Sequence, residues 1–314
     1  MGSGILMDGE LLAQAVVALV GEFIERYADE LTHMAATGER QALTNPRHAD
    51  NFLSEIDLRL HEAYRSRVAE ILPAFLYISE EGEPQIYPEA QSAWPELAVI
   101  VDPLDASEMA VRGLSARTHI SVYSMAEQVP LVSVVGDLFH YVQLYYAFRG
   151  TDGRHYAYLT TRAGETLPLR RSAVSELRYA WVTNYLMKPR GRFMKLAEQR
   201  PLLEALAGPA NSGGEHGRIG VDSGSIGLCH VAAGFTDAMV EVAKGFKLWD
   251  LFPGQHILTA AGGVIAALDG TPLSLDLGMR RLVDVKQIME TRRKFVAAGN
   301  EKLLQAIGGV LLRD

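Results

Sequence analysis

The chain has 314 residues, of which 48% are hydrophobic and 22% charged, and this composition is typical of a globular protein with a substantial core. Its 38 acidic and 30 basic side chains give a formal net charge of -8, which disfavours a nucleic acid polymer or an anionic membrane as partner. The single cysteine, Cys229, excludes an intrachain disulfide. Because we find neither a signal-peptide pattern nor an apolar run long enough to span a bilayer, we expect a cytoplasmic protein.

The first part of the chain combines helical and strand patterns. Apolar residues at helical spacing predict two helices, and two short apolar runs predict buried strands. In chain order we expect helices over 11–31 and about 51–72, and strands over 75–79 and 97–101. The second strand should stop at Asp102-Pro103, because the residue before a proline disfavours regular continuation.

The remainder of the chain changes from a β-rich pattern to an alternating one. Between residues 118 and 159, four runs of β-forming residues separated by turns predict an antiparallel sheet. Beyond it we expect strands over 179–183, 236–242 and 295–298, and helices over 193–206, 224–234, 249–261 and from 300 onward. This order predicts a layered α/β (α+β) fold with two halves, residues 8–175 and 176–314, packed as one compact unit.

The strongest local feature is the hexapeptide from Asp102 to Ser107, with the sequence Asp-Pro-Leu-Asp-Ala-Ser. In a tight loop, carboxylates three residues apart can point at one spot, where they repel each other unless a cation lies between them. Mg²⁺ prefers such oxygen ligands, and the carbonyl of Leu104 would add another. A helix beginning at Ala106 or Ser107 would present free amides to a phosphate. The same residues are also typical of a plain Asp-Pro turn with Asp105 as a helix N-cap.

Three further acidic residues lie far from this hexapeptide along the chain. Glu80 follows the first strand, Asp57 lies on the second helix, and Asp250 begins a later helix. Each alone has an ordinary interpretation, namely a solvated turn, a surface residue and a helix N-cap. Ligands of α/β sheets gather at the carboxyl ends of strands, however, and both Glu80 and Asp102 lie at such ends.

Taken in order, these sites resemble the inositol monophosphatase superfamily of lithium-sensitive, magnesium-dependent phosphatases. The family pattern is Glu-Glu after a strand, then Asp-Pro-(Ile/Leu)-Asp-(Gly/Ala)-(Thr/Ser), then a distant Trp-Asp that opens a helix. Its counterparts here are Glu80-Glu81, the hexapeptide and Trp249-Asp250. The resemblance implies an alternating αβαβα sandwich of the inositol monophosphatase and fructose bisphosphatase type. It also implies a homodimer that acts on a small phosphorylated metabolite.

The resemblance further implies a set of metal ligands. Glu80, Asp102 and the Leu104 carbonyl would hold one Mg²⁺ ion, and Asp102, Asp105 and Asp250 would hold a second. A third, weaker ion would lie near Glu80, partly through water. Glu80 therefore counts as both a metal ligand and a catalytic residue.

Other residues match the family's catalytic and substrate positions. Asp57 and Ser107 correspond to the acid–hydroxyl pair that polarises the attacking water, and the amides of Ala106 and Ser107 would hold the phosphate. For the leaving alcohol, Glu241 roughly matches a hydroxyl-binding acid of the inositol enzymes, although its spacing to the Trp-Asp motif differs. Ser225 is a second candidate that could equally be only a helix cap.

Departures from the family pattern leave the substrate open. Ala106 replaces the commoner glycine, and the ending Ala-Ser followed by Glu108 is closer to the branch that cleaves 3′-phosphates from bisphosphates. The basic run 188–192 either reaches a second phosphate or is a solvated charge cluster. We expect an inositol monophosphatase-like phosphomonoesterase. The alternatives are a 3′(2′),5′-bisphosphate nucleotidase, a sugar-phosphate phosphatase, a non-catalytic module on the same fold, and a glycosidase with paired carboxylates.

Overall fold

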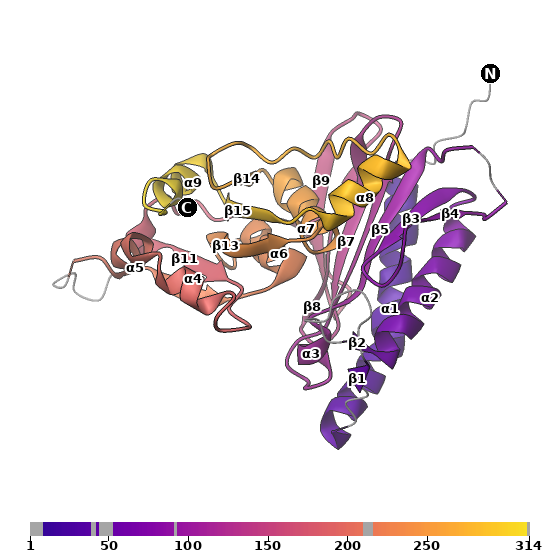
Figure 1. Cartoon of the computed structure of the whole chain (residues 1–314), viewed down its shortest axis with the longest axis horizontal. Coiled ribbons are helices and arrows are strands. Elements are labelled where there is room, and N and C mark those ends of the chain that lie inside the picture. Colours follow the sequence, from indigo (N-terminus) through magenta and orange to yellow (C-terminus); the bar gives the residue numbers. More distant parts are fainter. Residues whose placement is uncertain (1–8, 39–41, 44–52, 91–92, 210–215, 313–314) are drawn as a thin grey trace. The chain divides into compact units, whose positions relative to one another are not determined.

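The computed structural model describes residues 9–38, 42–43, 53–90, 93–209 and 216–312. Contacts between residues divide the chain into two units (Figure 1). Unit 1 comprises Met1–Leu167 and Asp276–Lys286, and unit 2 comprises Pro168–Leu275 and Gln287–Asp314. Unit 1 therefore includes a short segment from the C-terminal part of the chain.

A single large sheet forms the framework of unit 1. Its strands are β3 (Phe75–Ser79), β4 (Gln85–Tyr87), β5 (Leu97–Asp105), β6 (Arg117–Ser124), β7 (Val129–Asp137), β8 (Val142–Arg149), β9 (His155–Thr161) and β10 (Thr166–Pro168). They lie in the order β10-β9-β8-β7-β6-β5-β3-β4. Strands β3 and β5 are parallel, whereas β5 to β9 pair antiparallel. The antiparallel middle is thus confirmed. Two further short strands, β1 (Ala42–Leu43) and β2 (Leu53–Ser54), pair with each other.

Two long helices cover one face of this sheet (Figure 1). They are α1, Gly9–Thr37, and α2, Glu55–Ile71. Helix α1 packs on β7 and β8, and α2 packs on β5, because each presents a continuous apolar stripe whose burial is favourable. Gly136 on β7 allows the close approach of α1, since a β-carbon there would lie 2.8 Å from the side chain of Val20. The helix predicted over 11–31 is confirmed, and α2 begins at Glu55. The helix expected from about Asn51 thus begins later than predicted, because Leu53–Ser54 form β2, while Asn51 itself lies outside the described residues.

Unit 2 is built on a five-stranded sheet. Its strands are β11 (Trp181–Asn184), β12 (Arg218–Val221), β13 (Ala238–Phe246), β14 (Val264–Ala266) and β15 (Arg293–Ala298), in the order β12-β11-β13-β15-β14. Its helices are α4 (Phe193–Ala197), α5 (Arg200–Ala207), α6 (Gly224–Ala233), α7 (Leu248–Ala260) and α9 (Glu301–Gly308). Helix α6 packs on β13 and on α7. Cys229 of α6 is fully buried, and burial raises the pKa of its thiol, so it is a core residue as predicted.

Several predicted boundaries are wrong. The strand expected to stop at Asp102-Pro103 continues through Asp105, and the helix expected over 193–206 is divided into α4 and α5. Strands β4, β10, β12 and β14 were not predicted, because short edge strands carry little periodic signal. Helix α8 (Leu282–Glu290) was also not predicted.

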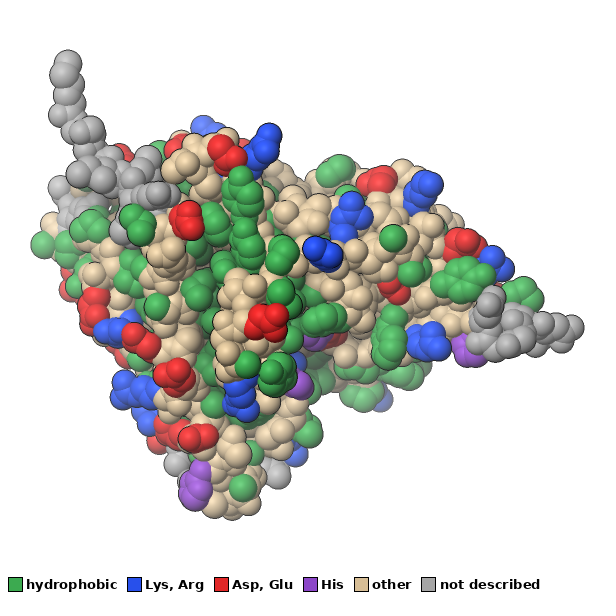
Figure 2. Space-filling view, turned by 180° about the vertical axis from the view of Figure 1, so that it is seen from behind, with side chains coloured by type: hydrophobic (Ala, Val, Ile, Leu, Met, Phe, Trp, Pro, Cys, Tyr) green, Lys and Arg blue, Asp and Glu red, His purple; other side chains and the backbone are tan. Residues whose placement is uncertain are grey.

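The surface carries charges of both signs. Basic and acidic side chains are interspersed on the face shown in Figure 2. Ion pairs join some of the exposed charges of the molecule, for example Arg67 with Glu22 and Glu70. Among the described helices, none combines the length and the apolar character that crossing a bilayer requires.

Candidate active site

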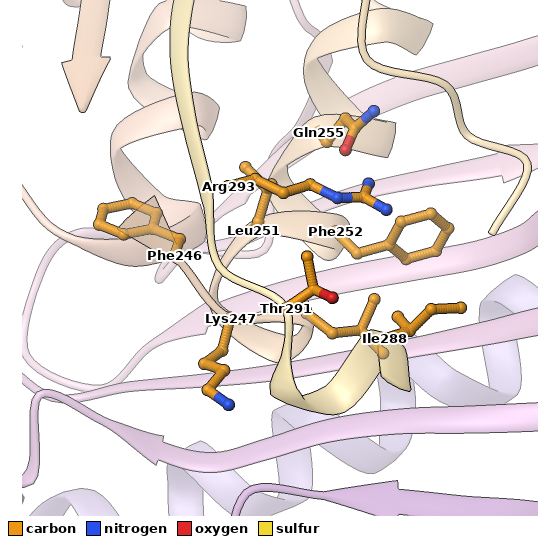
Figure 3. A pocket seen from close by; sticks show the side chains of 9 residues that line it. Phe246, Lys247, Leu251, Phe252, Gln255, Ile288, Thr291 and Arg293 are labelled. Atoms are coloured by element: carbon orange, nitrogen blue, oxygen red, sulfur yellow. The ribbon is translucent and has the colours of Figure 1, made fainter. Parts of the chain in front are cut away.

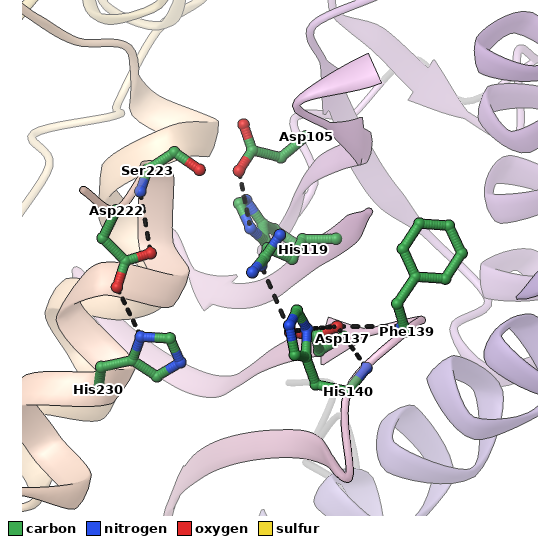
Figure 4. A network of polar contacts seen from close by, with 9 residues as sticks. Asp105, His119, Asp137, Phe139, His140, Asp222, Ser223 and His230 are labelled. Atoms are coloured by element: carbon green, nitrogen blue, oxygen red, sulfur yellow. Dashed lines mark hydrogen bonds and ion pairs between the residues drawn. The ribbon is translucent and has the colours of Figure 1, made fainter. Parts of the chain in front are cut away.

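A β-bulge brings the two aspartates of the hexapeptide to the same face of the sheet. Asp102 lies opposite His119 on β6, whereas Asp105 lies opposite Arg117, so the register shifts by one residue between them. Side chains three positions apart on a regular strand would point to opposite faces. Here Oδ2 of Asp102 lies 4.0 Å from Nδ1 of His119. Oδ2 of Asp105 lies 3.8 Å from Nε2 of the same ring, as Figure 4 shows. The carboxylates of Asp102 and Asp105 therefore both lie beside the imidazole of His119.

Glu80 lies at the same edge of the sheet as this bulge. It follows β3, which runs parallel to β5 with Ser79 opposite Val101. A carboxylate oxygen of Glu80 lies within 4.8 Å of one of Asp102. Because ionised carboxylates at this separation repel each other, and because hard divalent ions prefer such oxygens, these two residues could hold a divalent metal ion.

Asp57 and Ser107 are in direct contact. Asp57 is 1% exposed in the first turn of α2, and the hydroxyl of Ser107 lies 2.7 Å from its Oδ1. The same hydroxyl lies 2.8 Å from the carbonyl oxygen of Leu104. Since a serine has one hydroxyl proton, donation to Asp57 leaves the Leu104 carbonyl available to another ligand.

The turn after β5 has an unusual backbone conformation. Ala106 has φ 63° and precedes a helix of only four residues, α3 (Ser107–Ala110). The residue that caps this helix is Ala106, so the interpretation of Asp105 as its N-cap is wrong. The left-handed conformation explains why glycine suits this position, because a β-carbon is disfavoured there.

We therefore expect Ala106→Gly to be neutral or stabilising by at most about 1 kcal/mol, because relief of left-handed strain outweighs the extra entropy of the unfolded chain. Ala106→Val should be destabilising by more than about 1 kcal/mol, since a β-branched residue tolerates this conformation poorly. Urea unfolding of both variants measures the difference. A stable valine variant would contradict the assigned conformation.

The backbone of Asp102 is held from the helical face of the sheet. The hydroxyls of Tyr64 and Thr118 lie 2.5 Å apart, and the Thr118 hydroxyl lies 3.5 Å from the Asp102 carbonyl oxygen. Burial raises the pKa of Tyr64 well above its usual value, so this phenol stays protonated and can donate a hydrogen bond. These contacts help position the loop independently of any ligand.

Unit 2 carries Asp250 and Ser225. Asp250 is the third residue of α7, and its Oδ2 accepts a hydrogen bond from the backbone N–H of Lys247 at 3.2 Å, so the N-cap is Lys247 and not Asp250. The Ser225 hydroxyl donates to the Asp250 carbonyl at 2.8 Å and accepts from the N–H of Gly254 at 3.0 Å. It is thus not the cap of α6, and it connects α6 to α7.

Glu241 is fully buried in unit 2. Its side chain forms an ion pair with Arg192 and accepts hydrogen bonds from the N–H groups of Ala243 at 2.8 Å and Gly245 at 3.1 Å. The Arg192 guanidinium also lies 4.4 Å from the ring centroid of Tyr185. Arg192 is therefore not part of a solvated charge cluster, contrary to one interpretation of the basic run.

Arg192→Met should lower the free energy of unfolding by about 3 kcal/mol, because it leaves the buried carboxylate of Glu241 without its cation. Urea unfolding at neutral pH measures this loss, with the exposed Arg190→Met as the control. Addition of Glu241→Gln to Arg192→Met should restore part of the stability. A single variant as stable as the unmodified chain would contradict the pairing.

Sequence reasoning missed a polar row on β6. Arg117, His119 and Ser121 alternate along the strand and are all buried. Arg117 forms an ion pair with Asp137, whose two oxygens also lie 2.9 Å from Nδ1 of His140 (Figure 4). Polar residues at every second position were the available signal, because they indicate one polar face of a strand.

Two other features belong to unit 2. Asp222 lies 2.5 Å from Nδ1 of His230 and accepts a hydrogen bond from the N–H of Ser223 (Figure 4). Figure 3 shows a small pocket beside α7 that includes Phe252 and Arg293. Burial lowers the pKa of Arg293, and none of the 9 residues that line the pocket is acidic. Those residues do not form a metal site.

The chain resembles several known proteins. A model of the "Inositol monophosphatase family" matches residues 9–307. The chain is 26% identical over 229 residues to Nus factor SuhB of Pasteurella multocida, covering 72% of this chain and 76% of that protein. It is 24% identical over 250 residues to inositol monophosphatase 2 of Homo sapiens, covering 79% of each. A solved structure, inositol monophosphate bound SaIMPase-II, matches with TM-score 0.63 and 18% identity over 95% of this chain and 94% of that one.

Sheets covered by helices, with carboxylates clustered at the carboxyl ends of β3 and β5, define an α/β protein with a candidate metal site. The chain belongs to the inositol monophosphatase family. This finding confirms the resemblance drawn from the acidic motifs, and the structural match confirms the predicted fold class.

Proposed function

We propose that the chain is a Mg²⁺-dependent phosphomonoesterase that releases inorganic phosphate from a small phosphorylated metabolite. The contact between the Ser107 hydroxyl and Asp57, beside the carboxylates of Asp102 and Glu80, carries this proposal. The pair of Asp57 and Ser107 can polarise a water molecule, and the carboxylates of Asp102 and Glu80 can hold cations. Family membership supports the same reaction.

In this proposal, Glu80, Asp102 and the Leu104 carbonyl would hold one Mg²⁺ ion. Asp102, Asp105 and Asp250 would hold a second, and a third would bind weakly near Glu80. Bound Mg²⁺ supplies Lewis acidity and lowers the pKa of water. The assignment of Asp250 follows the family pattern of the Trp-Asp motif.

The remaining steps fall to other side chains and amides. The Asp57 carboxylate accepts a hydrogen bond from the Ser107 hydroxyl, whose oxygen accepts one from the attacking water and orients it. As the new P–O bond forms and the P–O bond to the alcohol breaks, the water proton would pass through the Ser107 hydroxyl to Asp57, and the leaving alkoxide would take a proton from solvent water. The N–H groups of Ala106 and Ser107 bind phosphate oxygens, on which charge develops during transfer. Ser225 and Glu241 remain candidates for contact with the leaving alcohol, although both already have partners within unit 2.

The alcohol is proposed to be inositol-like, and membership of the inositol monophosphatase family supports this choice. A 3′(2′),5′-bisphosphate nucleotide or a sugar phosphate is the alternative. Phosphate release from inositol 1-phosphate, adenosine 3′,5′-bisphosphate, fructose 1,6-bisphosphate and sugar monophosphates tests the proposal, with and without a chelator. Hydrolysis that persists in the chelator would contradict the role of the metal.

A second candidate is a non-catalytic binding module on the same fold. The match to a protein named Nus factor SuhB favours it. No turnover of any phosphomonoester by protein with Mg²⁺ bound would support the module and overturn the phosphatase.

We also propose a cytoplasmic homodimer that lithium inhibits, as the family resemblance implies. Light scattering during gel filtration tests the dimer, and a monomeric mass would exclude it. Phosphatase assays with lithium chloride, with sodium chloride as the control, test the inhibition.

A further inference from the structure

We propose that Arg117 is an internal counter-ion of the acidic site. It partly neutralises Asp105 in the metal-free protein and thereby weakens the binding of a divalent ion to that carboxylate. The inference rests on the proposed function, because it takes Asp105 to be a metal ligand.

Arg117 lies between two carboxylates in a row across three strands. Asp105 on β5 is its register partner on one side, and Asp137 on β7 is its partner on the other. Residues directly opposite each other on antiparallel strands point to the same face, with their β-carbons about 5 Å apart. Arg117 is 6% exposed. Its charge is therefore poorly screened by water.

Asp137 does not neutralise this guanidinium by itself. Its Oδ1 accepts hydrogen bonds from the N–H groups of Phe139 and His140, both at 3.1 Å, and its two oxygens also contact the His140 ring (Figure 4). Nε of Arg117 remains 3.5 Å from Oδ2 of Asp137. Within the described part of the chain, Nε and Nη1 of Arg117 have no hydrogen-bond partner. We infer from the cross-strand pairing that the positive charge also acts on Asp105.

The charge of an arginine is permanent at any physiological pH. A fixed, poorly screened positive charge beside a metal-binding carboxylate weakens the affinity for a divalent ion, by on the order of tenfold. The same charge stabilises Asp105 when no metal is bound. Arg117 thus favours the metal-free state and disfavours the metal-bound one.

Titration calorimetry with Mg²⁺ alone, without substrate, tests the inference on the whole chain. Arg117→Met should tighten Mg²⁺ binding by about tenfold. The matched control is Arg112→Met, because Arg112 is an exposed arginine paired with Glu108 beyond the hexapeptide. Its Mg²⁺ affinity should not change. Equal affinities of Arg117→Met and the unmodified chain would overturn the inference, as would an unmodified chain that binds no Mg²⁺.

Thermal unfolding supplies a second measurement. Arg117→Met should lower the melting temperature of the metal-free protein, and saturating Mg²⁺ should remove most of that difference. If Arg117 only served as an ion-pair partner of Asp137, the loss would be the same with and without Mg²⁺. That outcome would overturn the inference.

If Arg117→Met does not fold, a second variant with the opposite expected effect on Mg²⁺ affinity tests the inference. Asp137→Asn removes the other negative partner of Arg117 and keeps an acceptor for the backbone N–H groups, so Mg²⁺ binding should weaken. Unchanged binding would overturn the inference. Because these measurements need no turnover, they remain distinct from the phosphatase assay. If the unmodified chain hydrolyses phosphomonoesters but the variants bind Mg²⁺ as it does, only the role of Arg117 is rejected. If the variants change Mg²⁺ affinity as expected but the unmodified chain hydrolyses no phosphomonoester, only the phosphatase is rejected.

Discussion

Asp102→Asn should lower kcat/KM for any phosphomonoester substrate by about ten thousandfold, equivalent to about 5 kcal/mol of transition-state stabilisation. The reason is that Asp102 is assigned to both of the first two Mg²⁺ ions in the proposed site. An amide keeps the shape of the side chain but removes its charge. Steady-state phosphate release and Mg²⁺ calorimetry on the same protein preparations measure the two consequences.

The thermal stability of Asp102→Asn shows whether its loss of activity comes from a missing metal ligand or from unfolding. Asp102 is 1% exposed and lies within 4.8 Å of a Glu80 oxygen, so removal of its charge should relieve repulsion in the metal-free protein. We expect its melting temperature without Mg²⁺ to equal or exceed that of the unmodified chain. The exposed Asp152→Asn is the control for both measurements. Near-normal turnover by Asp102→Asn would reject the metal assignment.

Asp57→Asn should lower kcat by about a thousandfold, within the range expected for loss of a positioned acid–base group. Mg²⁺ affinity should fall much less than in Asp102→Asn, because Asp57 contacts the Ser107 hydroxyl and is not an assigned metal ligand. Loss of turnover that exceeds the loss of metal binding distinguishes this role from that of Asp102.

A double-variant cycle sharpens this prediction. Ser107→Ala should cost about as much as Asp57→Asn, and the double variant should lose little more, since residues that act as one unit are not additive. Glu55→Gln, an exposed acid in the same turn of α2, is the control. Fully additive losses would show that the two residues act independently.

The elements nearest the site illustrate how far sequence reasoning extends. The strand before Glu80 and the apolar strand before Asp102 were predicted from local patterns, and the structure contains both. The continuation of β5 through Pro103 was not predicted, because a proline usually ends a ladder. Here a bulge accommodates it, and a bulge depends on the partner strand β6.

The residues of the candidate site were likewise predicted only in part. Asp57, Glu80, the hexapeptide and Asp250 could be selected from one sequence, because carboxylates after strands and at helix starts form a recognisable order. That order predicted the family, which the comparisons confirm. The contact between Asp57 and Ser107 followed only from the resemblance, since 50 positions separate the two residues.

Cross-strand pairing accounts for what sequence reasoning left undetermined. His119 and Arg117 face the two aspartates because of a one-residue register shift, and register depends on how distant segments pack together. The local sequence around Arg117 carries no sign of its two acidic neighbours. The sequence alone thus determined the chemical character of the hexapeptide. Which charged side chains surround it depends on the pairing of β5, β6 and β7, and only the tertiary structure shows that pairing.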